Sequence, residues 1–127
     1  MFSHVMVGSD DLAASRTFYD AVLGALGAKP GFTDDKGRLI YAHNGGRFLV
    51  SAPIDGEPAS HANGGTIGFA ATSPEEVEAW HAAGVANGGV SIENPPGVRE
   101  GGFGKLYLAY LRDPAGNKLC AAHRMPA

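Results

Sequence analysis

The amino-acid sequence predicts an α+β domain built from two copies of one strand–helix–strands module. Within residues 2–26, apolar residues first alternate with a period of two and then recur at steps of three and four, which indicates a strand followed by a helix. The same stretch returns without a gap 62 positions later, with His4 aligned to Thr66. Short apolar runs separated by turn residues follow each helix, and such runs favour a mostly antiparallel sheet.

The first module opens with a strand at residues 2–7. The helix that follows has an apolar face running from Leu12 to Leu26. Ser9 or Asp10 is expected to accept the unpaired amides of its first turn, because short polar side chains are the preferred caps. Gly27 is expected to end the helix in a left-handed conformation.

Three short strands are expected after this helix, at residues 28–34, 38–42 and 47–51. The last two are joined by Asn44-Gly45-Gly46, and Asn-Gly is a strong hairpin signal. Residues 54–63 show no periodicity and are interpreted as the linker between the modules.

The second module opens with a strand at residues 65–71 and a helix from Pro74 to about Asn87. The start of this helix combines the cap Ser73, a proline at the first helical position and a glutamate three residues after the cap. Further strands are expected at residues 90–93, 105–111 and 117–123. Residues 94–104 are rich in glycine and proline and are interpreted as a long loop, either a mobile lid or a tolerated insertion. The aligned helix residues Phe18 and Trp80 are expected in the core.

Composition indicates one globular domain. The chain has 127 residues, enough for a sizeable core. A net charge of −3 and a pI near 5.9 argue against nucleic acid or an anionic membrane as partners. No apolar run approaches the ~20 residues that span a bilayer, and no charged and then apolar leader is visible. The single cysteine excludes an internal disulfide, which fits a cytoplasmic location.

Two motifs carry a resemblance to a known superfamily. One is His4-Val-x-Val-x-x-x-Asp11-Leu-x-x-Ser15-x-x-Phe18-Tyr19-x-x-x-Leu23-Gly24, and the other is Tyr110-Leu-Arg-Asp113-Pro114-x-Gly116-Asn117-x-Leu119. With the internal repeat they span nearly the whole chain. The sequence therefore resembles the vicinal oxygen chelate superfamily, which includes glyoxalase I, bleomycin-resistance proteins, fosfomycin-resistance enzymes and extradiol dioxygenases.

The resemblance implies a fold and an assembly. Residues 1–127 would form one domain of two tandem βαβββ modules, with module one at 1–53, the linker at 54–63 and module two at 64–123. Their strands would curl into one cupped, mixed, mostly antiparallel sheet. The resemblance also implies a homodimer.

The resemblance further implies four metal-ligand positions on the first and last strands of each module, usually occupied by His, Glu or Gln. Here they carry His4, Val50 (or Ser51, if the register slips), Thr66 and Cys120. Only His4 is of the expected type. Two adequate ligands, one of them a thiol that must lose its proton, do not make a convincing site for magnesium, manganese or ferrous iron. We therefore expect no bound metal and no cofactor, with a divalent metal as the alternative.

The predicted ligand-binding residues are His4, Thr66, Tyr110, Cys120 and Arg99. Two interpretations of His4 stay open. It either contacts a ligand and acts as an acid or base, or it is a former metal ligand that is now only hydrogen-bonded inside the cup. Cys120 fits a small buried apolar residue better than a nucleophile, and Thr66 fits an ordinary strand threonine. Tyr110 offers a hydroxyl over the cup, and Arg99 could close over a ligand from the long loop. His43, His61 and His81 are expected at the surface.

Four functions remain open. The first is binding of an amphipathic small molecule, without metal, in a cup lined by Met6, Tyr41, Leu108 and Tyr110. The second is a divergent metal-dependent lyase, transferase or dioxygenase, lactoylglutathione lyase-like, using His4 and Cys120. The third is a metal-free isomerase or epimerase with His4 as base and Tyr110 as acid. The fourth is a structural or interaction module. The missing ligands favour binding.

Overall fold

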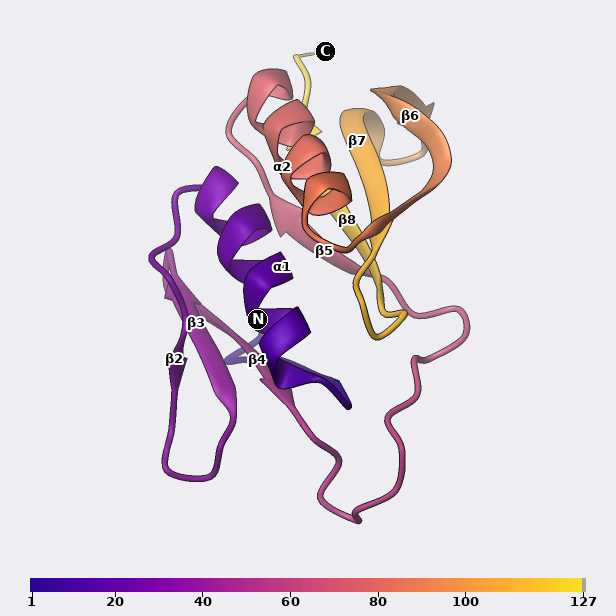
Figure 1. The fold of residues 1–127 in the computed structure, drawn as a ribbon. Helices are drawn as coiled ribbons and strands as arrows, with labels where there is room; N and C mark the ends of the chain where they lie inside the picture. The colour runs from indigo at the N-terminus through magenta and orange to yellow at the C-terminus, as the bar shows by residue number, and fades with distance from the viewer. Residues whose placement is uncertain (127) are drawn as a thin grey trace.

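The computed structural model describes residues 1–126 and confirms the α+β class and the two tandem modules (Figure 1). In module one the elements are β1 (Val5–Gly8), α1 (Leu12–Ala25), β2 (Phe32–Thr33), β3 (Leu39–His43) and β4 (Gly46–Ser51). In module two they are β5 (Ile67–Ala70), α2 (Pro74–Ala86), β6 (Val90–Gly101), β7 (Gly104–Arg112) and β8 (Lys118–Arg124). No helix of the described chain is long and apolar enough to cross a membrane.

The modules have the same sheet topology. Sheet A has the strand order β1-β4-β3-β2, and sheet B has the order β5-β8-β7-β6. In each sheet the first strand of the module runs parallel to the last one, and all other pairs are antiparallel. A parallel neighbour needs a crossover connection, and the single helix of each module supplies it. The repeat seen in the sequence is therefore a structural repeat.

The start of α1 differs from the prediction. Its N-cap is Asp11, whose Oδ1 accepts a hydrogen bond from the Ala14 amide at 3.0 Å. Ser9 instead accepts from the Asp11 amide at 3.1 Å, so it holds the cap and does not serve as one. The predicted stop is confirmed, because Gly27 has a φ of +97° and the Ala28 amide donates back to the Leu23 carbonyl at 3.0 Å.

The start of α2 is as predicted. Ser73 Oγ accepts from the Glu76 amide at 3.1 Å, and Pro74 occupies the first turn. The Glu76 carboxylate turns back to the amide and hydroxyl of Thr72, both at 3.0 Å. These bonds fix the direction in which α2 leaves β5.

The predicted loop at residues 94–104 is wrong, because β6 runs through most of it. β6 pairs with β7 as far as Gly101 opposite Gly104. The ladder is interrupted only between Ile92 and Gly97, where two prolines fall and Glu93 has a φ of +58°. Proline removes a ladder donor, which an edge strand such as β6 tolerates. The expected strand at 28–34 is reduced to β2.

Both modules contribute to one core. Helices α1 and α2 pack against each other, and α2 also packs on β6, β7 and β8 (Figure 1). The core joins residues of both sheets and both helices, with Phe18 and Trp80 fully buried as predicted. Between the sheets, the rings of Phe48 on β4 and Phe69 on β5 lie 5.3 Å apart, edge to face.

A buried polar cluster also joins the modules, and we call Tyr19, Asp113 and Asn117 the junction cluster. The Tyr19 hydroxyl on α1 donates to Asp113 Oδ2 at 2.5 Å, at the end of β7. Asn117 Nδ2 donates to Asp113 Oδ2 at 2.9 Å and to the Gly8 carbonyl at the end of β1 at 3.1 Å. Burial, and then the charge of Asp113, raise the pKa of Tyr19 well above its usual value. The second sequence motif thus has a structural role at this junction.

Candidate functional site

Each sheet has one face turned toward the helices, and we call the opposite side its outer face. In sheet B, Ala109, Leu111 and Leu119 belong to the core. Because side chains alternate along a strand, Tyr110 and Cys120 point to the outer face. In sheet A, Val5 and Val7 pack on the core, so Met6 points to the outer side of β1, and His4 lies one residue before this strand.

The structure brings Tyr110 and Cys120 together on the outer face of sheet B. They are directly opposite each other on β7 and β8. Lys118 Nζ lies 5.0 Å from the centroid of the Tyr110 ring, in cation–π geometry, and forms an ion pair with Glu93. The neighbouring β6 contributes Arg99.

Arg99 and Thr66 differ from their predicted settings. Arg99 donates to the carbonyls of Gly97 and Asn94, both at 3.0 Å. It therefore braces the irregular part of its own strand and does not extend from a free loop. Thr66 lies one residue before β5 and is exposed.

The Cys120 thiol is neutral near pH 7. Burial, and then the charge of Glu93, raise its pKa to about 11, although Lys118 and Arg99 act in the opposite direction. Partial burial raises the pKa of Tyr110, and the ionised form of Cys120 and the charge of Glu93 add to this. A neutral buried thiol is a poor nucleophile, which agrees with the apolar role expected for Cys120.

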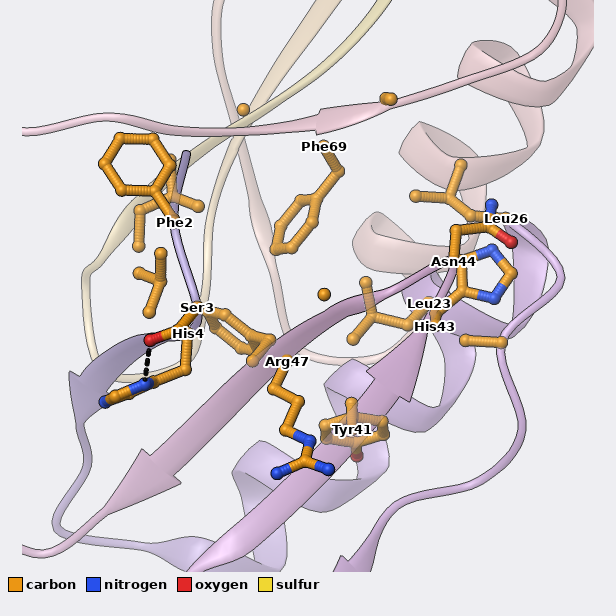
Figure 2. Close-up of a pocket in the computed structure, with 17 residues that line it drawn as sticks. Phe2, Ser3, His4, Leu23, Leu26, Tyr41, His43, Asn44, Arg47 and Phe69 are labelled. Carbon is orange, nitrogen blue, oxygen red and sulfur yellow. Dashed lines mark hydrogen bonds between the residues drawn. The ribbon is translucent and has the colours of Figure 1, made fainter.

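A pocket of about 350 Å³ lies between the two modules, and we call it the inter-module pocket (Figure 2). It is bordered by the start of β1, the C-terminal end of α1, the β3–β4 hairpin and β5. Its apolar lining comprises Phe2, Val5, Leu23, Leu26, Ala28, Tyr41, Phe48, Ile67, Phe69 and Ala70. Its polar lining comprises Ser3, His4, His43, Asn44 and Arg47. The side chains of His4, His43 and Arg47 are all exposed.

Of the predicted ligand-binding residues, His4 alone lines the inter-module pocket. It is exposed, and its Nδ1 is 2.8 Å from Ser3 Oγ. Thr66, Tyr110, Cys120 and Arg99 are not part of the lining. The predicted pairing of His4 as base with Tyr110 as acid is therefore not assembled at this pocket.

Of the four residues predicted to line the cup, Tyr41 alone lines the inter-module pocket, and Met6, Leu108 and Tyr110 do not. Tyr41 is only 2% exposed and belongs to the core, so its ring forms part of the inner wall. Its hydroxyl donates to Asp20 Oδ1 at 2.6 Å, so only the ring is offered to the pocket. The lining residues Leu23, Leu26, Phe48 and Phe69 were not predicted, since their apolar periodicity also fits ordinary core positions.

The strand register corrects one metal-ligand position. Met6 is opposite Leu49 on β4, just as its repeat counterpart Gly68 is opposite Cys120 on β8. Leu49, and not Val50, is therefore the module-one counterpart of Cys120. Val50 is fully buried in the core.

The four positions thus hold His4, Leu49, Thr66 and Cys120, a donor set that does not fit a divalent metal. Leucine offers no donor atom, the threonine hydroxyl is a weak ligand, and the thiol is protonated. Within residues 1–126, no three His, Cys, Asp or Glu side chains are grouped closely enough to hold a metal ion. No step of a reaction can be assigned to a metal held by these residues.

The fold and the pocket define a small protein of paired βαβββ modules. The family model described as Glyoxalase/Bleomycin resistance protein/Dioxygenase superfamily matches residues 1–121, and the chain belongs to this family. The predicted relationship to the glyoxalase and bleomycin-resistance proteins is confirmed.

Solved structures agree with this assignment. A glyoxalase/bleomycin resistance protein from Albidiferax ferrireducens T118 is 59% identical, with 97% of this chain and 98% of that chain covered and a TM-score of 0.94. A glyoxalase/bleomycin resistance protein/dioxygenase family enzyme from Burkholderia phytofirmans PsJN is 18% identical, covers 97% and 98%, and has a TM-score of 0.72. Lactoylglutathione lyase from Agrobacterium tumefaciens is 22% identical, covers 97% and 92%, and has a TM-score of 0.66. The last two show the fold alone, and a comparison with curated proteins gives no match.

Proposed function

We propose that this protein binds a small, largely apolar molecule in the inter-module pocket and does so without a metal. The observation that carries the proposal is the pocket itself. Its volume of about 350 Å³ lies in the range of roughly 300–1,000 Å³ typical of ligand sites. Aromatic and aliphatic side chains dominate its lining, with few polar groups at its border, as is usual for such sites.

The pocket is suited to binding because its walls belong to the rigid core. Leu23, Leu26 and Phe48 are each less than 9% exposed and are held by the helix and sheet around them. Preorganised walls spare a ligand the entropic cost of ordering them. Burying one group the size of a phenyl ring in such a site gains about 1.5–3 kcal/mol.

The predicted contacts on the outer face of sheet B form a second proposed contact region. Tyr110 and Cys120 are paired across strands, Arg99 lies on the adjacent strand, and Thr66 precedes β5. The ring of Tyr110 under Lys118 gives this region both apolar and charged groups. His4 is the proposed contact at the inter-module pocket.

A second copy of this chain is the proposed partner. β1 and β5 each have a neighbour on one side only, and a free strand edge can pair with another chain. Next to the edge of β1, Phe2 is 76% and Met6 53% exposed. Sedimentation of the wild type and of Met6→Lys tests this proposal, with a dimer expected for the first and a shift toward monomer for the second. A cytoplasmic location is proposed because Cys120 is a free thiol.

The alternative of a metal-dependent lyase, transferase or dioxygenase is tested by elemental analysis of the purified protein. We expect far less than one divalent ion per chain. A stoichiometric ion that is lost in His4→Ala would overturn the metal-free proposal.

Binding is tested with N-phenyl-1-naphthylamine, a neutral fluorescent probe. We expect saturable binding of one probe per chain and its loss in Ala28→Phe, because Ala28 lines the pocket and a phenyl ring there occupies its space. Ala82→Phe is the matched control, since Ala82 is exposed on α2 and away from the lining. Absence of saturable binding, or binding that survives Ala28→Phe in a folded protein, contradicts the proposal.

A further inference from the structure

We infer that the ligand of the inter-module pocket is an aromatic anion, with its ring in the pocket and its carboxylate or sulfonate at the mouth beside Arg47. This inference rests on the proposed function and adds the chemical class of the ligand. It is carried by the distribution of charge around the pocket and by the kind of side chain inside it.

The lining of the pocket carries a positive charge although the whole molecule is acidic. Arg47 lines it beside the imidazoles of His4 and His43, and no aspartate or glutamate does. The chain as a whole carries a formal charge of −3. A concave site bordered by one sign of charge raises the local concentration of ligands of the opposite sign.

Among the arginines of the described chain, Arg47 is the one whose guanidinium makes no hydrogen bond or ion pair within the protein. The other five arginines each donate hydrogen bonds to a carbonyl, a hydroxyl or a carboxylate, namely Arg16, Arg38, Arg99, Arg112 and Arg124. For Arg47 the described residues provide neither a hydrogen bond nor an ion pair. Its exposed guanidinium remains free to bind a carboxylate or sulfonate in bidentate fashion.

The interior of the pocket selects for a ring. Phe69 enters from the side of β5, while Leu23 on α1 and Leu26 just after it line the pocket from the other side (Figure 2). The rings of Phe48 and Phe69 already meet edge to face, an arrangement that a third ring can extend. The hydroxyl of Tyr41 donates its hydrogen bond to Asp20 and is not available to a ligand. The inner walls of the pocket therefore offer aromatic ring faces and methyl groups.

The test compares two probes that share their rings and differ in charge. One is 8-anilinonaphthalene-1-sulfonate and the other is the neutral N-phenyl-1-naphthylamine. At low salt we expect the sulfonate to bind about tenfold more tightly, and we expect salt to reduce this advantage, because an exposed charge pair is screened.

Arg47→Met removes the charge and keeps an apolar stem. We expect this variant to bind the sulfonate about tenfold more weakly and the neutral probe with unchanged affinity. The control Lys36→Met removes the same charge from an exposed turn residue away from the pocket, and we expect it to bind both probes like the wild type. Far-UV circular dichroism and thermal midpoints of all variants show whether each is folded.

The outcomes separate this inference from the proposed function. If both probes bind equally and Arg47→Met changes neither affinity, the anion is not recognised and only this inference fails. If neither probe binds saturably, the proposed function fails with it. If the sulfonate binds but Ala28→Phe leaves that binding intact, the anion occupies another site and this inference is overturned.

Discussion

The surroundings of Cys120 change the acid–base chemistry of its thiol. Its thiol is buried on β8, opposite Tyr110 and near Glu93, and these surroundings raise its pKa to about 11. Nothing next to Cys120 in the sequence predicts Glu93 as a neighbour, because Glu93 reaches it through the irregular part of β6. The apolar character of Cys120 could be predicted from the sequence, but the size of its shift could not.

We predict that Cys120 reacts slowly with thiol reagents in the folded protein. At pH 8 a thiol with a pKa of about 11 contains roughly a hundredfold less thiolate than an ordinary cysteine with a pKa near 8.5. The rate of labelling by 5,5′-dithiobis(2-nitrobenzoate) should therefore be at least about a hundredfold below that of the urea-unfolded chain. Equal rates for the folded and unfolded protein would contradict the assigned environment.

Two buried tyrosines predict a loss of stability at alkaline pH. Burial raises the pKa of Tyr19, and burial with the hydrogen bond to Asp20 raises the pKa of Tyr41. Both stay neutral in the folded protein, whereas in the unfolded chain they ionise near pH 10. Their contribution is complete below pH 10 and is lost as the pH rises above it, at about 1.4 kcal/mol per pH unit for each. Urea unfolding between pH 7 and 11 measures this loss, and Tyr41→Phe should reduce it.

Tyr19→Phe tests the junction cluster at neutral pH. The change leaves Asp113, which is 3% exposed, without one of its donors. Loss of a hydrogen bond to a buried carboxylate costs about 1–3 kcal/mol in the free energy of unfolding. The value is read from urea denaturation at pH 7. A change below about 0.5 kcal/mol would show that the junction cluster does not hold the modules together.

At the scale of the elements, the two helices are related in sequence but differ in their surroundings. Phe18 and Trp80 are both fully buried, as their alignment predicts. The aligned pair Leu23 and Val85 differ, with exposed fractions of 5% and 50%. Leu23 lies where α1 borders the inter-module pocket, and no residue of α2 lines that pocket. A sequence repeat predicts that the same helix occurs twice. It does not predict which of the two helices borders the inter-module pocket.

The same substitution is predicted to have opposite effects in the two helices. A Cβ on Gly84 of α2 would lie 2.3 Å from Leu111 Cδ1 and 3.2 Å from Val22. Gly84→Ala should therefore lower the free energy of unfolding by about 1–3 kcal/mol through overpacking, although alanine favours helix. A Cβ on Gly24 of α1 meets nothing within 4 Å, so Gly24→Ala should raise it by up to about 1 kcal/mol. Urea denaturation of the two variants measures both signs, and stabilisation by Gly84→Ala would contradict the close helix packing.

Strand β6 marks the limit of element prediction for this chain. Its run of glycine and proline fits a loop when read alone, and the pairing with β7 is a long-range property that overrides it. The β3–β4 turn was better predicted, because its conformation depends on local sequence alone. Asn44 and Gly45 both adopt left-handed conformations there, with φ values of 49° and 83°.

At the scale of the whole molecule, the shared core predicts one cooperative unfolding transition. Leu39 of module one and the single tryptophan, Trp80 of module two, belong to the same buried cluster. Leu39→Ala should lower the free energy of unfolding by about 2–5 kcal/mol. It should shift the urea midpoint equally when unfolding is followed by Trp80 fluorescence and by far-UV circular dichroism. Separate midpoints for the two signals would indicate modules that unfold independently.

The family and the two-module plan could be predicted from the sequence, because motif spacing and repetition are local properties. The inter-module pocket could not, since it depends on how the start of β1, the end of α1 and β5 meet. Val50 was mistaken for the counterpart of Cys120 for the same reason, because only the pairing of β1 with β4 fixes the register.

The junction cluster and the lining of the inter-module pocket have no residue in common. Tyr19, Asp113 and Asn117 join the halves at one end of β1, while the cavity opens near the other end. A descendant of this chain can therefore exchange Leu26 or Phe69 and acquire a new ligand preference while the hydrogen bonds of the junction cluster stay in place, although the packing between the modules changes with it. A polar anchor that lies outside the pocket in this way lets one small scaffold diversify.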